Sequence, residues 1–319
     1  MAQLGTDGKG SARPLAIGAL LVVSLLWASG PLRSELLPER FSRAWPPLAA
    51  QALPMALLTL TSVTIDWCRK AHWPRAQRLR SSIWIGLGLF TAPAILIHFS
   101  AGRVPGQARI ALFTLVPVFS IVLEPYLGNA ATRPIRGALP AAFLAVLGAL
   151  LVFQVTVPAS LKDASAVAAC VLTAACIAAA NCYAVVIFRD SGDHSAVPIA
   201  AIAGSAATVS LGIASLLLER SSWQPGVLAP GLLWAAAVEL PALLLLFWLM
   251  RRLSATRMAT RFVLGPLIVV PVGALLMQIP LAPRTLLGLF GMAAGAGYLL
   301  CAPESDAEPA TLLGRSHEP

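Results

Sequence analysis

Long apolar stretches separated by short polar or basic segments fill almost the whole chain. A helix needs about 20 mostly apolar residues to cross the hydrocarbon core of a bilayer. The pattern predicts ten such helices, although the weak boundaries at Arg103 and at Arg251-Arg252 also allow nine or eleven. We therefore expect an all-α, polytopic membrane protein with helices at residues 15–36, 46–66, 82–100, 104–127, 137–157, 164–188, 196–218, 229–250, 254–278 and 284–302.

The second half of the chain repeats features of the first half. A shift of 149 positions pairs several residues, namely Arg103 with Arg252, Phe113 with Phe262, Leu115 with Leu264, Pro117 with Pro266 and Leu127 with Leu276. Five helices per half is an odd number, so the halves would enter the membrane in opposite orientations, as in many secondary transporters. We expect one five-helix repeat over residues 1–157, a second over 158–302, and a polar, disordered cytoplasmic tail over 303–319.

The charge pattern predicts the orientation of the chain. Only 12% of the residues are charged, against about 25% in soluble domains. The net charge of +9 is explained by arginines in loops, without a nucleic-acid partner. A cytoplasmic N-terminus places most basic residues inside, including a cluster over residues 69–80, and so predicts two cytoplasmic termini in an inner or plasma membrane. That cluster could also bind anionic lipid, but an orientation signal is the favoured interpretation.

Motifs of several enzyme classes are missing from the sequence. It contains no Gly-Lys-Ser/Thr phosphate loop, no serine nucleophile elbow and no His-Glu-x-x-His zinc helix. The five cysteines lack metal-ligand spacing. We expect neither enzymatic activity, nor a cofactor, nor a metal. If the chain is a transporter, the missing phosphate loop means that an ion gradient would supply the energy, or that the chain would catalyse facilitated diffusion.

Ionisable residues inside apolar helices are costly and mark candidate functional positions. Glu239 is the deepest acid and precedes Pro241, which would disturb the helix. It could bind a cationic group or take up a coupling proton, or it could fix helix packing as a neutral or arginine-paired residue. His98 is a second candidate for proton coupling, although an interfacial structural role is favoured.

Two arginines are candidates for binding substrate. Arg109 begins a stripe with Phe113, Ser120 and Glu124 that should face the bundle interior. Its guanidinium could hold a carboxylate bidentately, but at its shallow depth snorkelling to the interface is favoured. Arg261 is deeper and could pair with Glu239, whereas Arg257, one turn earlier, would anchor the helix at the inner surface.

Aromatic and amide side chains complete the set of candidates. Trp27, Asn181 and Tyr183 would line a cavity if the two repeats pack as expected, although interhelical packing is an alternative for each of them. Pro117, Pro241 and Pro266 are expected to break their helices. Broken helices of this kind mark the binding sites of many transporters built from repeats.

These features together resemble the EamA-type branch of the drug/metabolite transporter superfamily. The resemblance covers nearly the whole chain and includes Trp27-Ala-Ser-Gly30, the helices at Pro117 and Pro266, and the stretch from Ala178 to Arg189. The family carries a glutamate about twelve residues after each such proline, where this chain has the amides Asn129 and Gln278. The resemblance implies a central cavity, alternating access and efflux of amino acids or other small metabolites.

The leading hypothesis is therefore a secondary transporter, an exporter of small polar metabolites, that contacts a small-molecule substrate and membrane lipid. A homodimer is compatible with the sequence. One alternative is a membrane scaffold that retains the fold but binds lipid or a partner without transporting anything. Another is an intramembrane enzyme, for which Glu239 and His98 form the only candidate pair.

Overall fold

The computed structural model describes residues 7–36, 47–69, 76–127, 137–153, 155, 158–189, 196–219 and 223–302. Every regular element in these ranges is helical. The helices, in chain order, are α1 (Asp7–Leu36), α2 (Leu48–Arg69), α3 (Ala76–Gly86), η1 (Leu87–Thr91), α4 (Ala92–Ser100), α5 (Gly106–Phe113), α6 (Val116–Leu127), α7 (Ala138–Val152), α8 (Leu161–Arg189), α9 (Ala196–Leu218), α10 (Pro225–Trp234), η2 (Ala235–Glu239), α11 (Leu240–Met250), α12 (Ala255–Ala259), α13 (Arg261–Leu276) and α14 (Pro283–Cys301).

The helices are those of a multi-pass membrane protein. Eight helical stretches in the described part of the chain are long and apolar enough to cross a bilayer, and two shorter apolar helices are Pro14–Gly30 and Ala138–Val152. Each of the ten predicted apolar ranges contains helix, and the range 196–218 coincides with α9. The all-α prediction is confirmed. Backbone N–H and C=O groups inside a bilayer must be hydrogen-bonded within the protein, and a helix achieves this within one segment.

Two of the spanning helices contain a π-helical turn in their interior, between two α-helical segments. The stretch α3–η1–α4 has its π-turn at Leu87–Thr91, and the stretch α10–η2–α11 has its π-turn at Ala235–Glu239. The N–H of Ala92 donates to the carbonyl of Leu87, and the N–H of Leu240 donates to the carbonyl of Ala235. Both bonds reach five residues back, so each turn holds one residue more than an α-helical turn.

Two other spanning helices are interrupted near their middle or beginning. Between α5 and α6 the N–H groups of Thr114 and Leu115 bond three residues back, to Ala111 and Leu112. Between α12 and α13 the N–H of Thr260 does the same with the carbonyl of Arg257. Tight turns of this kind let one span change direction without leaving its backbone groups unpaired.

The three predicted proline breaks have different outcomes. Pro117 follows the α5–α6 interruption closely, and Pro241 lies in the first turn of α11, directly after η2. Pro266, in contrast, lies inside the continuous helix α13, and the interruption occurs at Thr260 instead. The prediction of a break at Pro266 is wrong, because a proline in a membrane helix removes one hydrogen bond and the surrounding turns can absorb that loss.

The end of α13 explains how an amide can replace the expected glutamate. Gln278 has a left-handed backbone with φ of 54°. The N–H of Ile279 donates to the carbonyl of Ala274 at 2.9 Å, and the N–H of Gln278 donates to that of Leu275 at 3.4 Å. This is the hydrogen-bond pattern of a Schellman motif, which ends a helix through the backbone and needs no acidic side chain. Asn129 lies outside the described residues.

Helices far apart in the sequence pack in pairs. The most extensive contacts join α7 to α14 and α2 to α9, followed by α6 with α8, and then equally by α1 with α13, α3 with α9 and α4 with α8. Small residues allow close approaches between the helices. A Cβ atom added to Gly148 would lie 2.5 Å from the carbonyl oxygen of Gly288, and a Cβ atom added to Gly288 would lie 2.6 Å from the carbonyl oxygen of Gly148. Such contacts between small residues are typical of membrane helix pairs.

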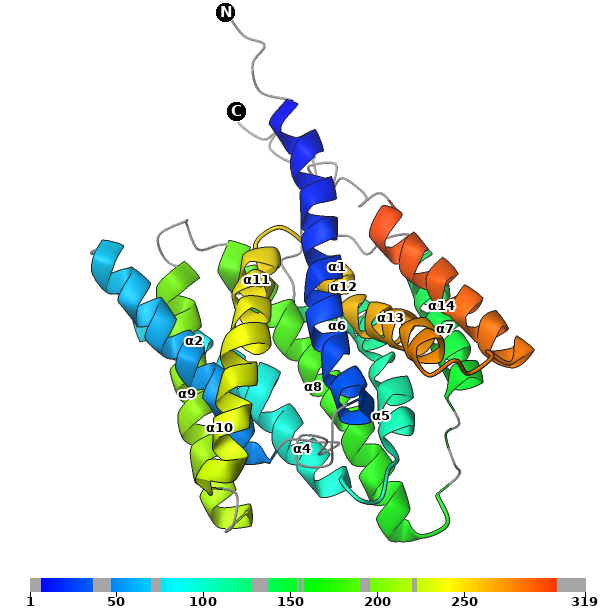
Figure 1. Ribbon diagram of the computed structural model, residues 1–319. Helices are drawn as coiled ribbons and strands as arrows, with labels where there is room; N and C mark the ends of the chain where they lie inside the picture. Colours follow the sequence, from blue (N-terminus) through cyan, green and yellow to red (C-terminus); the bar gives the residue numbers. More distant parts are fainter. Residues whose placement is uncertain are drawn as a thin grey trace, which may run out of the picture.

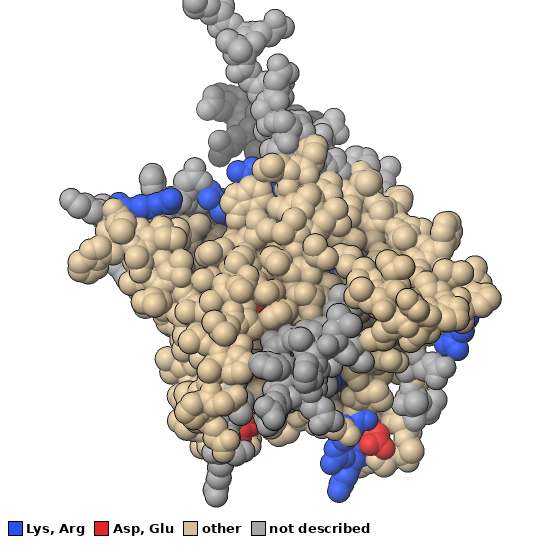
Figure 2. All heavy atoms as spheres, in the orientation of Figure 1, with Lys and Arg blue, Asp and Glu red and all other residues tan. Residues whose placement is uncertain are grey.

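The spans run alternately up and down, so the start of α1 and the end of α14 lie at the same end of the molecule (Figure 1). On the face shown in Figure 2, most charged side chains lie towards this end and the opposite end, and the surface between them is almost without charged residues. The ends of α2, α8 and α11, on the side where α1 begins, carry Arg69, Arg189, Arg251 and Arg252. We call the side where α1 begins the α1 end, and the opposite side, where α9 ends, the α9 end.

Candidate functional site

Four of the predicted site residues meet inside the molecule. The guanidinium of Arg261 lies 5.3 Å from the centre of the Trp27 ring, and its Nη2 donates to Oδ1 of Asn181 at 3.2 Å. Phe262 lies beneath the same guanidinium at 4.7 Å, and its ring packs edge-on against Phe113 with 6.5 Å between centroids. We call these five residues the central cluster.

The central cluster draws on four helices. Trp27 belongs to α1, Phe113 to α5, Asn181 to α8, and the Arg261–Phe262 pair to the first turn of α13. Phe113 is the last residue of α5, and Phe262 is the second residue of α13, so the two helix interruptions bring these two rings together. The interruptions therefore position the cluster.

The polar groups of the cluster are enclosed. Asn181 is 0% exposed and Arg261 is 5% exposed. Nη1 of Arg261 donates to the carbonyl of Met258 at 3.1 Å. Two further buried donors, Nε of Arg261 and Nδ2 of Asn181, have no hydrogen-bond partner among the described residues. Most buried polar atoms in proteins are paired, so two unpaired donors in contacting side chains require an explanation.

Arg261 does not pair with Glu239 as the sequence suggested. Its hydrogen bonds go to Asn181 and Met258, and among the described residues no carboxylate contacts it. Glu239 is the last residue of η2 and is half-buried. Helix packing decides which residues of neighbouring spans meet, and sequence spacing does not contain that information.

The predicted stripe on the α5–α6 helix is buried. Arg109 is 8% exposed, Ser120 is 0% and Glu124 is 8%, while Phe113 is half-buried. The expectation that this face points into the bundle is confirmed. Arg109 lies near Cys170 of α8. A Cβ atom added to Gly106, the first residue of α5, would lie 3.9 Å from Nη2 of Arg109, so the guanidinium extends towards the start of its helix, as snorkelling requires. Arg109 is not among the residues that contact Arg261.

Glu124 links the two interrupted helices at the α1 end. Oγ1 of Thr256 donates to Oε2 of Glu124 at 2.5 Å, and both side chains are buried. The carboxylate also lies next to the backbone N–H groups of Ala255 and Thr256 in the first turn of α12. An acidic group is stabilised at a helix amino end by the N–H groups that lack partners within the helix.

Arg257 has a different role from the predicted surface anchor. It is only 5% exposed, and its Nη2 donates to the carbonyl of Ala302 at 2.8 Å. Ala302 is the residue that ends α14, so the guanidinium satisfies a carbonyl at the end of that helix. The correction has a simple cause: a long arginine side chain can reach a neighbouring helix end as easily as the membrane surface.

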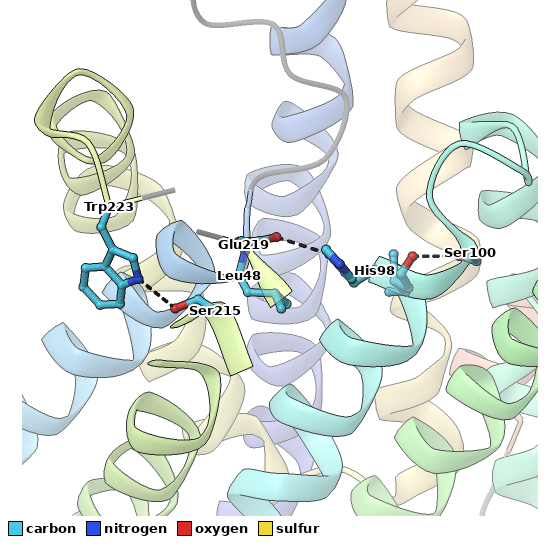
Figure 3. A network of polar contacts seen from close by, with 7 residues as sticks. Leu48, His98, Ser100, Ser215, Glu219 and Trp223 are labelled. Carbon is cyan, nitrogen blue, oxygen red and sulfur yellow. Dashed lines mark hydrogen bonds and ion pairs between the residues drawn. The ribbon is translucent and has the colours of Figure 1, made fainter. Parts of the chain in front are cut away.

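His98 forms a separate network at the α9 end (Figure 3). Its Nδ1 lies 3.2 Å from Oε1 of Glu219, and Oε2 of the same carboxylate accepts the backbone N–H of Leu48 at 2.8 Å. Ser215 accepts a hydrogen bond from the indole of Trp223 at 3.1 Å beside it. The carboxylate thus caps α2 and joins α2, α4 and α9. The catalytic pair of His98 with Glu239 is not formed.

Tyr183 lies away from the central cluster. Its hydroxyl donates to Oγ of Ser81 on α3 at 2.7 Å. Residues two positions apart in an α-helix are separated by about 200° around the helix axis. Asn181 and Tyr183 therefore face opposite sides of α8. Sequence analysis missed this consequence of the helical period, and it missed Glu219 because that residue follows the end of its apolar segment.

Comparisons with known proteins identify the fold alone. No family model matches the chain, and no curated protein matches it in sequence. Similar solved structures exist. One of them, described only as the crystal structure of a protein, has a TM-score of 0.69 at 13% identity and covers 90% of this chain and 98% of its own. The fold of nearly the whole chain therefore occurs in a protein of very different sequence.

Proposed function

We propose that the chain is a secondary transporter of small polar metabolites that works by alternating access. The observation that carries this proposal is the central cluster, in which polar and aromatic side chains meet, enclosed, at two helix interruptions. Polar residues at membrane depth are costly and usually mark a pathway or a binding site. Export is the direction implied by the resemblance to the drug/metabolite transporters, and we include it in the proposal.

The arrangement of helices supports ten spans in two inverted repeats. In this arrangement the helices from α1 to α7 form five spans, and those from α8 to α14 form five more. The helix α2 is then equivalent to α9, and α7 is equivalent to α14. Each of these helices packs on its equivalent in the other half. The contact of α1 with α13 corresponds to that of α8 with α6, and η1 corresponds to η2. Two halves that exchange contacts in this way can rock against each other around a site between them.

An export assay tests the proposal. Cells without exporters of their own would express wild type, Arg261→Gln or Glu239→Gln, and small metabolites in the spent medium would be compared. We expect at least one metabolite to accumulate outside with the wild type and with the control variant Arg252→Gln, and not with Arg261→Gln or Glu239→Gln. Arg252→Gln is the matched control, because this exposed guanidinium also lies over an indole ring, 4.3 Å from the centre of Trp248.

The variants must be present at matched levels in the membrane for the comparison to hold. Equal media from all strains, including a strain without the protein, would contradict export. Loss of export in Arg252→Gln to the same extent as in Arg261→Gln would contradict the placement of the site in the central cluster.

A further inference from the structure

We propose that the central cluster binds the carboxylate of an organic monocarboxylate with a planar apolar body. This inference rests on the proposed transport function and names its substrate class. It starts from an unbalanced charge: Arg261 is 5% exposed, and no carboxylate of the described residues contacts it. An enclosed cation normally has an anionic partner, because desolvation disfavours an isolated charge.

The unpaired hydrogen-bond donors point to the same ligand chemistry. A guanidinium has five N–H groups, and Arg261 uses Nη1 for Met258 and Nη2 for Asn181. Within the described part of the chain, Nε of Arg261 and Nδ2 of Asn181 remain without hydrogen-bond partners. Both groups donate hydrogen bonds and neither can accept one in this arrangement. A carboxylate accepts several hydrogen bonds and carries the missing negative charge.

The aromatic side chains select the rest of the ligand. The rings of Trp27 and Phe262 lie 5.3 and 4.7 Å from the guanidinium carbon of Arg261, and Phe113 packs against Phe262. Aromatic surface next to a few fixed donors is typical of sites that bind a flat apolar group with one polar end. A ligand with an ammonium group would need an acid, and no acid of the described residues contacts Arg261.

The donors are closed off from solvent in this conformation, so a ligand can enter only when the halves separate. The Glu124–Thr256 contact joins α6 and α12 at the α1 end. The need for the halves to separate agrees with alternating access, in which a central site is reached from one face at a time.

Binding of radiolabelled benzoate to the purified full-length protein in lipid nanodiscs tests the inference. We expect saturable binding that unlabelled benzoate displaces and that benzamide, benzylamine and sodium chloride do not displace at the same concentration. Arg261→Gln should weaken binding roughly tenfold to hundredfold, the usual effect of losing hydrogen bonds to a charged group. Arg252→Gln should bind benzoate like the wild type.

A second variant keeps the test valid if Arg261→Gln fails to fold. Asn181→Asp changes few atoms and supplies a carboxylate beside Arg261 from within the protein. We expect this variant to unfold at the same or a higher temperature than the wild type, and to lose benzoate binding to the same extent as Arg261→Gln. Unchanged benzoate binding in Asn181→Asp would overturn the inference.

Other results separate this inference from the transport proposal. Absence of benzoate binding, or equal competition by benzamide or chloride, would each overturn the monocarboxylate class. Tighter binding of phenylalanine than of benzoate would overturn the inference that the ligand has no ammonium group. Benzoate binding without uptake or release in proteoliposomes would support the site and contradict the transporter. Transport of a neutral or cationic metabolite, unaffected by benzoate, would support the transporter and contradict the carboxylate site.

Discussion

The α7–α14 interface and the central cluster are both buried contacts between distant parts of the chain, but they consist of opposite kinds of residue. At the α7–α14 interface, small residues such as Gly148 and Gly288 bring two backbones together. In the central cluster, Arg261 and Asn181 each keep one N–H donor group that has no hydrogen-bond partner in the described ranges. The first contact is complete by itself, whereas the second becomes complete only with a ligand. The difference separates residues that hold the fold from residues available for function.

The largest effect on stability is expected at the α7–α14 interface. A Cβ at Gly295 would overlap the carbonyl of Ala141 and lie 2.9 Å from Cβ of Ala145, whereas a Cβ at Gly297 on the same helix meets open space. Gly295→Val should lower the free energy of unfolding by about 3 kcal/mol. Titration with a denaturing detergent, followed by tryptophan fluorescence, measures this loss. Gly297→Val is the control, and equal losses in both variants would contradict the close packing described here.

The link between Glu124 and Thr256 is expected to have the next largest effect. Thr256→Val removes the hydroxyl that donates to the buried carboxylate and should cost about 1 to 3 kcal/mol of stability. The same detergent titration applies. Thr64→Val is a suitable control because the Thr64 hydroxyl bonds to its own helix on an exposed face. A control variant that is destabilised as strongly would show that the loss does not come from this link.

The shape of the cation in the central cluster should matter as well as its charge. Arg261→Lys keeps the charge but loses the planar group that lies over Trp27 and Phe262. We expect benzoate binding to weaken by about tenfold, or about 1.4 kcal/mol. Arg252→Lys, measured in the same binding assay, should have no effect. Wild-type affinity in Arg261→Lys would mean that charge alone holds the ligand.

The smallest effect is expected outside both regions. Tyr183→Phe removes the hydrogen bond to Ser81 and should cost about 0.5 to 1.5 kcal/mol of stability, without changing benzoate affinity. Tyr126→Phe, at a side chain that is 82% exposed, gives the baseline. A strong loss of benzoate affinity in Tyr183→Phe would extend the binding site beyond the central cluster and weaken the comparison.

The fold followed from sequence more completely than the site did. The apolar stretches located the helices because a bilayer requires a minimum apolar length. The candidates Trp27, Phe113, Asn181 and Arg261 do meet, since residues in unusual settings within membrane helices tend to face the interior. The sequence did not predict which side chains these residues contact. The pairing of His98 with Glu219, for example, depends on how α4 and α9 pack.

The two π-helical turns have a consequence for the history of the chain. Because η1 and η2 each close with a bond five residues back, each absorbs one residue that a continuous α-helix would not hold. Deleting one residue from Leu87–Thr91 or from Ala235–Glu239 would restore the α-helical register and leave the flanking faces where they are. Sequences descended from the same ancestor are therefore expected to align with single-residue gaps at these two places and to tolerate few gaps elsewhere in the same spans.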